Sequence, residues 1–439
     1  MTDKKRNVDA TINCDILIVG GGIAGAGLGC LLAAKTNLNA VLIEASAQLG
    51  GRARSIDFAG QMIDFGLHAL LLGKRSSLFK MGKVVTSGIA VNPLGASIFR
   101  HGRLERLVGR SPVSFLASKG LELRSLLAMM RRVYLSGHRK DLYRISLDEL
   151  CRQYRASENV QDFLRCLSVG LVVNKNFSKV SAGEILAYLQ LSARRASLAG
   201  YPKGGWKSIW DRFEKILCEY KLRVNLGEQL KEIRVQNGRV THCLTDKGTY
   251  KPKRVVLAVP AQTIVEERLI PAESIDSETW KRLCGCKITY GINIDLLIEA
   301  GHMPQDIIFT LDPPTLAMIP TTASPGLVGP GRHLMTIFEP LGTDPSTELV
   351  EIQARGKALI DFYDRILPKL KNHILDQKIS VLPVLGAEVT TDSNFLDRPE
   401  IQCPSPENLF MIGDWVKCPG VGGERAFAGA LKCFELLTK

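Results

Sequence analysis

Short apolar runs separated by glycine-rich turns open the chain. Residues 16–19 are all apolar, as expected for a parallel strand that is buried on both faces. Glycines then follow in the spacing G-x-G-x-x-G, and a helix is predicted from roughly Ile23 to Lys35. A second apolar strand ends at Glu44, 19 residues after the last of these glycines. This order predicts a βαβ unit with parallel strands.

The remaining pattern alternates between helical and strand periods and contains no internal repeat. The stretch from Ser55 to Asp64 alternates around Gly60 and predicts a hairpin. Further strands are predicted at 222–233, 254–260, 287–295 and 408–413. Further helices are predicted at 146–167, 181–198, 207–220 and 347–367, and a last helix runs through Leu437. The middle of the chain is therefore expected to be mainly helical.

The first glycine motif has the chemistry of a phosphate cradle. Gly20 permits the tight turn after the strand, Gly22 lets the backbone approach a pyrophosphate, and Gly25 lets the helix pack closely on the strand. The helix points its N-terminal N–H groups at the phosphates. Glu44 is placed to accept the ribose hydroxyls of an adenosine. We therefore predict a dinucleotide-binding site.

A second glycine motif distinguishes FAD from NAD. The segment Glu44-Ala-Ser-Ala-Gln-Leu-Gly-Gly-Arg-Ala resembles the second glycine motif of the flavin-dependent amine oxidase, protoporphyrinogen oxidase and phytoene desaturase superfamily. The resemblance implies that Gly50 and Gly51 lie near the pyrophosphate and that Arg52 lies beside it. NAD dehydrogenases do not usually carry this motif, so the implied cofactor is FAD.

Three later segments extend the resemblance. The loop Phe65-Gly-Leu-His68 would lie against the flavin, with Gly66 approaching its ring system. The alternative for His68 is a loop histidine with a structural role only. Backbone near Leu230 would contact the adenine, and Asp414 would bond the ribityl chain. A turn at the end of a strand is the alternative for Asp414.

The helix that follows Asp414 would point its N-terminus at the flavin, which stabilises negative charge on the reduced cofactor. Its spacing from Glu424 to Gly429 is one residue shorter than usual, so the register of Gly423 and Glu424 against the flavin stays open. The predicted FAD-binding residues are Gly20, Gly22, Ile23, Ala24, Gly25, Glu44, Ala45, Gly50, Gly51, Arg52, Gly66, Leu67, His68, Leu230, Gly413, Asp414, Gly422 and Gly423.

The resemblance covers residues 14–68, 200–260 and 408–438. It implies an α/β fold in which a Rossmann-type FAD-binding domain is interwoven with a mixed α+β substrate domain. The expected divisions are a flexible tail at 1–10, an FAD-binding domain at 11–90, 200–264 and 396–439, and a substrate domain at 91–199 and 265–395.

Composition supports a folded protein and narrows its partners. Hydrophobic residues make up 45% and charged residues 23% of the 439 residues, which is ordinary for a globular protein. The net charge of +13 fits nucleic acid, an anionic membrane surface or a basic cellular background. Because no DNA- or RNA-binding motif is present, nucleic acid is not expected as a partner.

The eleven cysteines are scattered along the chain. Cys284-Gly-Cys286 lacks the spacing of a zinc site, so we expect reduced thiols, no metal and a cytoplasmic location.

A basic, amphipathic stretch runs from Arg103 to Lys140. Nine basic residues are interleaved with aliphatic ones, and the only acids are Glu105 and Glu122. This pattern suits an anionic bilayer surface, which would make the protein peripheral at the membrane. The alternative is a helical cap that packs on the second domain and exposes a basic face.

The sequence contains no catalytic constellation outside the flavin motifs. The resemblance is nearest to the phytoene desaturases. It implies an FAD-dependent oxidoreductase that takes a hydride from an apolar, polyisoprenoid- or carotenoid-like substrate and forms a C=C bond. The oligomeric state is left open.

Three other functions remain as alternatives. One is an amine oxidase, for which Lys287 is the candidate for a lysine facing flavin N5; His68 is the other catalytic candidate. The second is an isomerase or reductase that uses reduced FAD, and the third is a non-enzymatic binder of prenylated proteins. Cys418 is a candidate for covalent flavin attachment, with an ordinary loop cysteine as the alternative.

Overall fold

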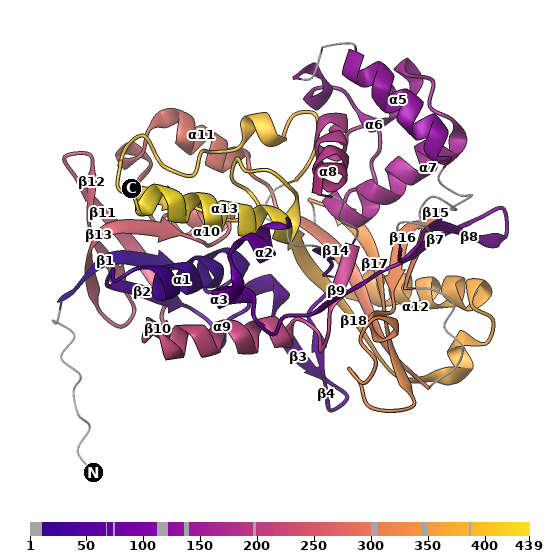
Figure 1. The fold of residues 1–439 in the computed structure, drawn as a ribbon, viewed down its shortest axis with the longest axis horizontal. Coiled ribbons are helices and arrows are strands. Elements are labelled where there is room, and N and C mark those ends of the chain that lie inside the picture. Colours follow the sequence, from indigo (N-terminus) through magenta and orange to yellow (C-terminus); the bar gives the residue numbers. More distant parts are fainter. Residues whose placement is uncertain are drawn as a thin grey trace.

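Two seven-stranded sheets organise the protein in this computed structural model (Figure 1). The structure describes residues 11–66, 68–72, 75–111, 122–135, 140–195, 199–299, 306–343, 349–385 and 388–439. The predicted tail at 1–10 therefore lies outside the described residues.

The first sheet has the strand order β10-β2-β1-β13-β12-β11, and β19 pairs with β13. Its strands are β1 (Thr11–Val19), β2 (Ala40–Glu44), β10 (Arg223–Leu226), β11 (Leu230–Gln236), β12 (Arg239–Thr245), β13 (Thr249–Leu257) and β19 (Leu409–Met411). The pairs β10–β2, β2–β1, β1–β13 and β13–β19 are parallel, whereas β11 and β12 form an antiparallel hairpin that continues to β13. The predicted βαβ unit is thus the centre of this sheet.

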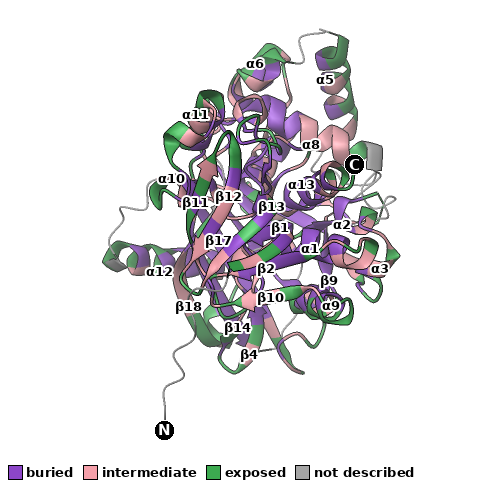
Figure 2. Ribbon diagram, turned by 90° about the vertical axis from the view of Figure 1, so that its left-hand side faces the viewer, coloured by how far each residue is buried: buried purple, intermediate pink, exposed green. Residues whose placement is uncertain are grey.

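Burial explains why the carboxyl-terminal parts of the central strands β1 and β13 are apolar. Ile16, Leu17 and Ile18 are completely buried, because the sheet is covered by helices (Figure 2). The helices α1 (Ile23–Lys35) and α13 (Gly422–Leu437) pack against each other, and α9 (Lys207–Glu219) packs against α1. The first and last segments of the chain therefore meet in one layer.

The second sheet has the order β18-β14-β17-β16-β15-β7-β8, and within it only the pair β15–β7 is parallel among the described strands. Its strands are β7 (Ala96–Arg100), β8 (Arg103–Val108), β14 (Thr289–Glu299), β15 (Ile307–Leu311), β16 (Pro314–Met318), β17 (Arg332–Gly342) and β18 (Ile374–Leu385). Both segments that were predicted to form the substrate domain contribute strands to this sheet. The observed architecture confirms the predicted α/β fold, with a parallel Rossmann-like sheet and a separate mixed sheet.

A helical layer covers one end of the second sheet, at the upper right of Figure 1. It contains α5 (Leu123–Leu135), α6 (Leu147–Gln153), α7 (Glu158–Leu167), the π-helix η3 (Ser168–Val172) and α8 (Ala182–Arg195). The other helices are α2 (Ser77–Lys80), α3 (Lys83–Thr86), α10 (Ala261–Glu266), α11 (Ser277–Gly285) and α12 (Leu349–Ile366). Two small sheets consist of β3 (Ser55–Phe58) with β4 (Gln61–Asp64), and of β5 (Leu70–Leu71), β9 (Ala199–Pro202) and β6 (Val91–Pro93).

The basic stretch from Arg103 to Lys140 is divided between different elements. His101 and Gly102 have φ values of 51° and 73°, which makes a tight turn that folds β8 back onto β7. The first part of the stretch is therefore a strand of the second sheet, and the helical part that the structure describes is α5. Residues 112–121 and 136–139 of this stretch lie outside the described residues. No helix in the described part of the chain is both long and apolar enough to cross a bilayer.

Candidate functional site

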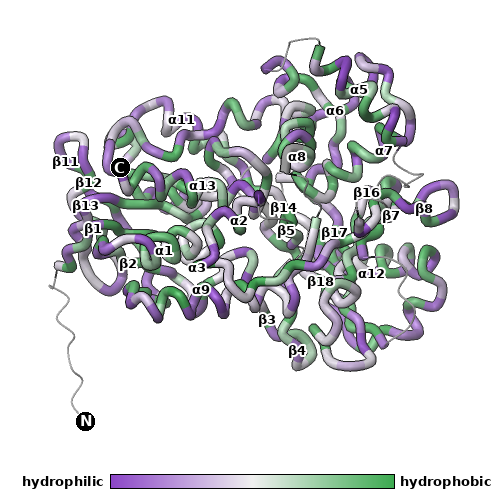
Figure 3. The backbone as a smooth tube through the Cα atoms, viewed as in Figure 1, coloured by the Kyte–Doolittle hydropathy of each residue, from purple (hydrophilic) through white to green (hydrophobic). Residues whose placement is uncertain are grey.

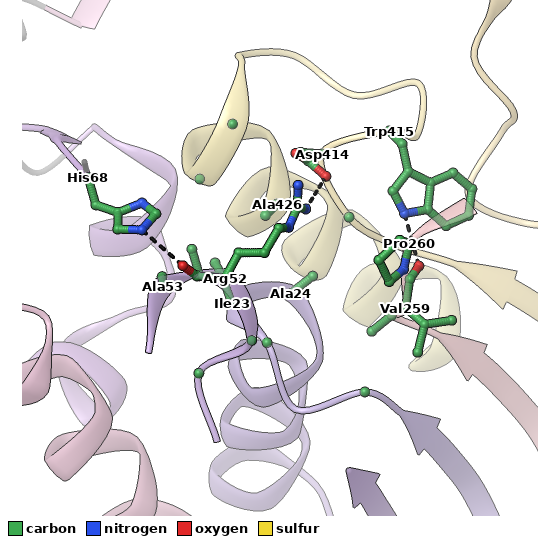
Figure 4. A pocket seen from close by; sticks show the side chains of 18 of the residues that line it. Ile23, Ala24, Arg52, Ala53, His68, Val259, Pro260, Asp414, Trp415 and Ala426 are labelled. Carbon is green, nitrogen blue, oxygen red and sulfur yellow. Dashed lines mark hydrogen bonds and ion pairs between the residues drawn. The ribbon is translucent and has the colours of Figure 1, made fainter. Parts of the chain in front are cut away.

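A cavity of about 450 Å³ lies at the carboxyl ends of the parallel strands, between the β1–α1 turn and the start of α13 (Figure 4). Fifteen of the predicted cofactor residues line it: Gly20, Gly22, Ile23, Ala24, Glu44, Ala45, Gly50, Gly51, Arg52, His68, Leu230, Gly413, Asp414, Gly422 and Gly423. Gly25 and Gly66 are buried but are not among its lining residues, and Leu67 lies outside the described residues. Segments from both ends of the chain thus build one cavity.

The three glycines of the first motif differ in what surrounds them. Gly20 has a φ of 105°, which L side chains rarely adopt, so it allows the turn. A Cβ on Gly25 would lie 1.9 Å from the carbonyl oxygen of Gly20, so this glycine lets α1 approach the strand. A Cβ on Gly22 would meet only Gly51 Cα, at 3.9 Å. The space in front of Gly22 is therefore open.

This open space fits the pyrophosphate of FAD. It lies at the N-terminus of α1, which has no acidic residue in its first turn. Helix N-terminal amides and the helix dipole favour a bound anion at this position. The protein would thus hold the phosphates mainly through backbone N–H groups.

Glu44 is held in place at the end of β2. Its Oε2 accepts a hydrogen bond from the Gly21 amide at 2.6 Å, and its Oε1 accepts from the amide and hydroxyl of Ser46 at 2.8 and 2.6 Å. Each carboxylate oxygen has two lone pairs, so Oε2 can still accept from a ribose hydroxyl. Leu230, at the start of β11, lines the same cavity, as the resemblance implied for the adenine end.

An ion pair connects the second glycine motif to the C-terminal motif. Arg52 Nη2 lies 2.7 Å from Asp414 Oδ1, although the residues are 362 positions apart in the chain (Figure 4). The backbone carbonyl of Asp414 accepts hydrogen bonds from Arg398 and Arg425. Arg425 Nη2 also pairs with Glu184 at 2.7 Å. Glu184, Arg398 and Arg425 are all buried, and this burial lowers the pKa of Arg398 to about 10.

The start of α13 shows where Gly423 and Glu424, whose register was left open above, lie relative to the cavity. The helix begins at Gly422, and both Gly422 and Gly423 line the cavity. Glu424 is buried, and its carboxylate accepts hydrogen bonds from the amide and hydroxyl of Ser77 at 3.0 and 2.5 Å. The shorter spacing therefore leaves the helix N-terminus at the site.

His68 lines both this cavity and a second one that is described below. Its Nε2 lies 2.9 Å from the carbonyl oxygen of Phe65 and 3.0 Å from that of Arg52. Because both partners are acceptors, Nε2 carries the proton and Nδ1 does not. Burial lowers the pKa of His68, so the ring is neutral at pH 7. The ring meets Trp206 edge-on, with 5.4 Å between ring centroids.

A buried carboxylate fastens the His68 loop to the loop that contains Trp206. Asp64 accepts hydrogen bonds from the Trp206 amide at 3.1 Å and from the Tyr201 hydroxyl. Burial raises the pKa of Asp64 to about 6, although these hydrogen bonds oppose the shift. The loop lies in the stretch 200–260 that the resemblance covered, but its contact with Asp64 could not be predicted from the sequence.

A second cavity of about 670 Å³ joins the first one. The two cavities share the lining residues His68, Ala69, Leu71, Gly170, Leu171, Tyr188 and Ala199. The other walls come from α5, α7, α8, β7, β8, β15 and β16. Among the described residues that line this cavity there is no Asp, Glu, Lys or Arg. None of its residues except His68 was predicted from the sequence as part of the site.

The structure does not bring Lys287 or Cys418 to the site. Lys287 is exposed, precedes β14, and is not among the described residues that line either cavity. Its carbonyl oxygen accepts a hydrogen bond from the Glu388 amide at 2.6 Å. Cys418 is buried beside the cluster, where its carbonyl oxygen accepts from Arg425, and it too lines neither described cavity.

The fold and the cavity define a flavoprotein oxidoreductase. Residues 30–283, more than half of the chain, match the family model described as flavin containing amine oxidoreductase. The chain belongs to this family, and it is an FAD-dependent enzyme. No curated protein matches it in sequence.

Solved structures with the same fold cover nearly the whole chain. An oxidoreductase from Methanosarcina mazei has a TM-score of 0.77 at 18% identity, covering 96% of this chain and 100% of its own. Putrescine oxidase bound to putrescine has a TM-score of 0.72 at 14% identity, with 98% and 100% covered. Cyclohexylamine oxidase from Brevibacterium oxydans has a TM-score of 0.68 at 13% identity, with 97% and 100% covered. These identities are low, so the likeness is one of fold.

Proposed function

We propose that this enzyme, like the phytoene desaturases that its sequence resembles, takes a hydride from an apolar, polyisoprenoid- or carotenoid-like substrate and forms a C=C bond. The observation that carries the proposal is the apolar cavity that joins the FAD cavity at His68, Leu171 and Tyr188. When bound, FAD supplies the acceptor for the hydride. The residues of this chain would exclude water and orient the reacting carbon.

The energetics of the cavity favour a hydrocarbon over an amine. Burying apolar surface contributes roughly 25 cal/mol per Å², so a long hydrocarbon chain gains by entering such a space. An ammonium group would lose its hydration and find no carboxylate among the described lining residues. The neutral ring of His68 adds no charge at the junction of the two cavities. Few polar groups are needed for binding if the substrate is a hydrocarbon.

Anaerobic mixing of the purified, FAD-loaded enzyme with candidate substrates tests the proposal. Phytoene in detergent micelles is expected to bleach the oxidised-flavin absorption bands, whereas putrescine and cyclohexylamine are expected to leave them unchanged. Bleaching by either amine without bleaching by phytoene would overturn the proposal and identify an amine oxidase.

A variant that narrows the junction makes the test specific to the cavity. Ala69 is exposed and lines both cavities, so Ala69→Trp has room to fill the passage between them. The variant should keep its FAD and lose reduction by phytoene. Ala272→Trp is the matched control, because Ala272 is also exposed but lines neither described cavity. Equal rates of reduction in the two variants would contradict the assigned path.

A further inference from the structure

We propose that α5 docks this enzyme on an anionic lipid bilayer and that the apolar cavity opens to the bilayer beside this helix. The second part rests on the proposed function, because an apolar substrate would reside in the membrane. Figures 1 and 2 place α5 at the periphery of the molecule, and Figure 3 shows hydrophobic and hydrophilic residues intermixed along it.

One stripe of α5 leads from the cavity to the surface. Leu123, Leu127 and Met130 line the cavity and follow one another at spacings of four and three residues, which places them on one helix face. Tyr134 continues the same stripe four residues later. Leu127 is 59% exposed and Tyr134 is 61% exposed, so the apolar lining continues outside the cavity.

The neighbouring stripe of α5 combines positive charge with an exposed aliphatic residue. Arg124 and Arg131 are seven residues apart and exposed, and Leu135 follows on the same side with 69% of its surface exposed. The helix contains no acidic residue. Glu122 lies just before the helix, and its carboxylate accepts hydrogen bonds from Ser157 and Asn159 at 2.6 and 2.7 Å. This acid is therefore held by neighbouring residues of the protein.

This combination fits a bilayer surface better than it fits a nucleic acid. Among the described residues, eight large hydrophobic side chains are exposed, and three of them lie on this one helix. Exposed aliphatic groups gain nothing from a phosphate backbone, whereas they can enter the boundary between lipid headgroups and acyl chains. Arginines at the same level are attracted to anionic headgroups, and the net charge of +13 adds to this attraction.

Co-sedimentation of the holoenzyme with lipid vesicles tests the docking surface. Wild-type enzyme should bind phosphatidylcholine vesicles that contain phosphatidylglycerol, and should bind weakly to phosphatidylcholine alone. Each basic residue near an anionic surface contributes a factor of about five to partitioning, so Arg124→Gln with Arg131→Gln should lower binding by about 25-fold. Leu135→Ser should lower binding to both kinds of vesicle.

A matched double variant separates local docking from total charge. Lys215→Gln with Lys281→Gln removes the same charge from exposed positions on α9 and α11, and it should bind vesicles nearly as well as wild type. An equal loss in both double variants, or no vesicle binding by the wild type, would overturn the proposal. All variants should retain FAD, which shows that they are folded.

The experiments can refute the docking surface and the proposed substrate independently of each other. Reduction by phytoene in micelles without vesicle binding would leave the proposed function standing and refute docking through α5. Vesicle binding without reduction by phytoene would support the surface and refute the link to substrate entry. If both hold, the variant at Arg124 and Arg131 should slow reduction by phytoene in anionic vesicles and leave the rate in micelles unchanged.

Discussion

The substitution Gly22→Ala is expected to weaken FAD binding while leaving the stability of the apoprotein nearly unchanged. The added Cβ would meet no protein atom closer than Gly51 Cα at 3.9 Å, and the φ of −74° at Gly22 suits any L-residue. The apoprotein should therefore stay within about 1 kcal/mol of wild type. The methyl group would occupy the space that we assign to the pyrophosphate. An overpacking cost of about 1–3 kcal/mol there lowers FAD affinity by roughly 5- to 150-fold.

Gly25→Ala is the matched variant, because the same methyl group would meet backbone instead of open space. The distance of 1.9 Å from its Cβ to the Gly20 carbonyl oxygen is about 1 Å too short, so α1 would have to move away from β1. Loss of this packing should destabilise the apoprotein by about 3 kcal/mol or more, in addition to the loss of FAD.

Two measurements on each variant decide the matter. Circular dichroism on heating gives the unfolding midpoint of the apoprotein, and quenching of FAD fluorescence on titration gives the dissociation constant. Gly22→Ala should change only the dissociation constant of FAD. Gly25→Ala should change both this constant and the unfolding midpoint of the apoprotein. Wild-type FAD affinity in Gly22→Ala would refute the assigned position of the pyrophosphate. If Gly22→Ala lowered the unfolding midpoint of the apoprotein as much as Gly25→Ala does, the conclusion that the space in front of Gly22 is open would be refuted.

Two further predictions concern buried charges. Because the pKa of Asp64 is about 6 in the folded protein and about 3.9 when unfolded, its contribution to stability is present at low pH and lost as the pH rises through about 6. Asp64→Asn should therefore gain up to about 3 kcal/mol relative to wild type between about pH 4 and pH 7, and a midpoint difference that does not change with pH would contradict this. Arg425→Met should cost about 3–5 kcal/mol because it removes the 2.7 Å partner of buried Glu184. Lys207→Met, which breaks an exposed pair, is its control and should cost less than about 1 kcal/mol in the same thermal unfolding assay.

The flavin-binding part of the fold could be predicted because each of its requirements fixes a residue type at a set spacing in the sequence. Such requirements are the positive φ at Gly20, the close packing at Gly25 and the carboxylate at the end of a strand. The resemblance placed Arg52 and Asp414 at the same cofactor, but their ion pair was not predicted, since nothing in the spacing of residues 362 positions apart fixes a distance. The placement of these residues along one cavity agrees with the predicted site, while their contacts with FAD stay a prediction.

The apolar cavity could not be predicted because it belongs to no single element. Gly170 and Leu171 reach it from a π-helix, whose wider turn shifts side chains away from the 3.6-residue period used to read helices. Arg103 to Val108 carries the same basic and aliphatic residues as α5, yet the turn at His101 and Gly102 places it in a sheet. Lys287 precedes its strand, so the prediction of a flavin-facing lysine finds no support in the geometry.

The joining of Arg52 to Asp414 also sets an order of events during synthesis. A ribosome adds about 5–20 residues per second, so the 362 positions between these two residues take roughly 20–70 s to make. During that interval β1, α1 and the glycine turns can form, but β19 and α13 do not yet exist to close the cavity or to cover α1. Capture of FAD is therefore a late step, and the apolar side of α1 must be protected in the nascent chain until α13 has been made and can cover it.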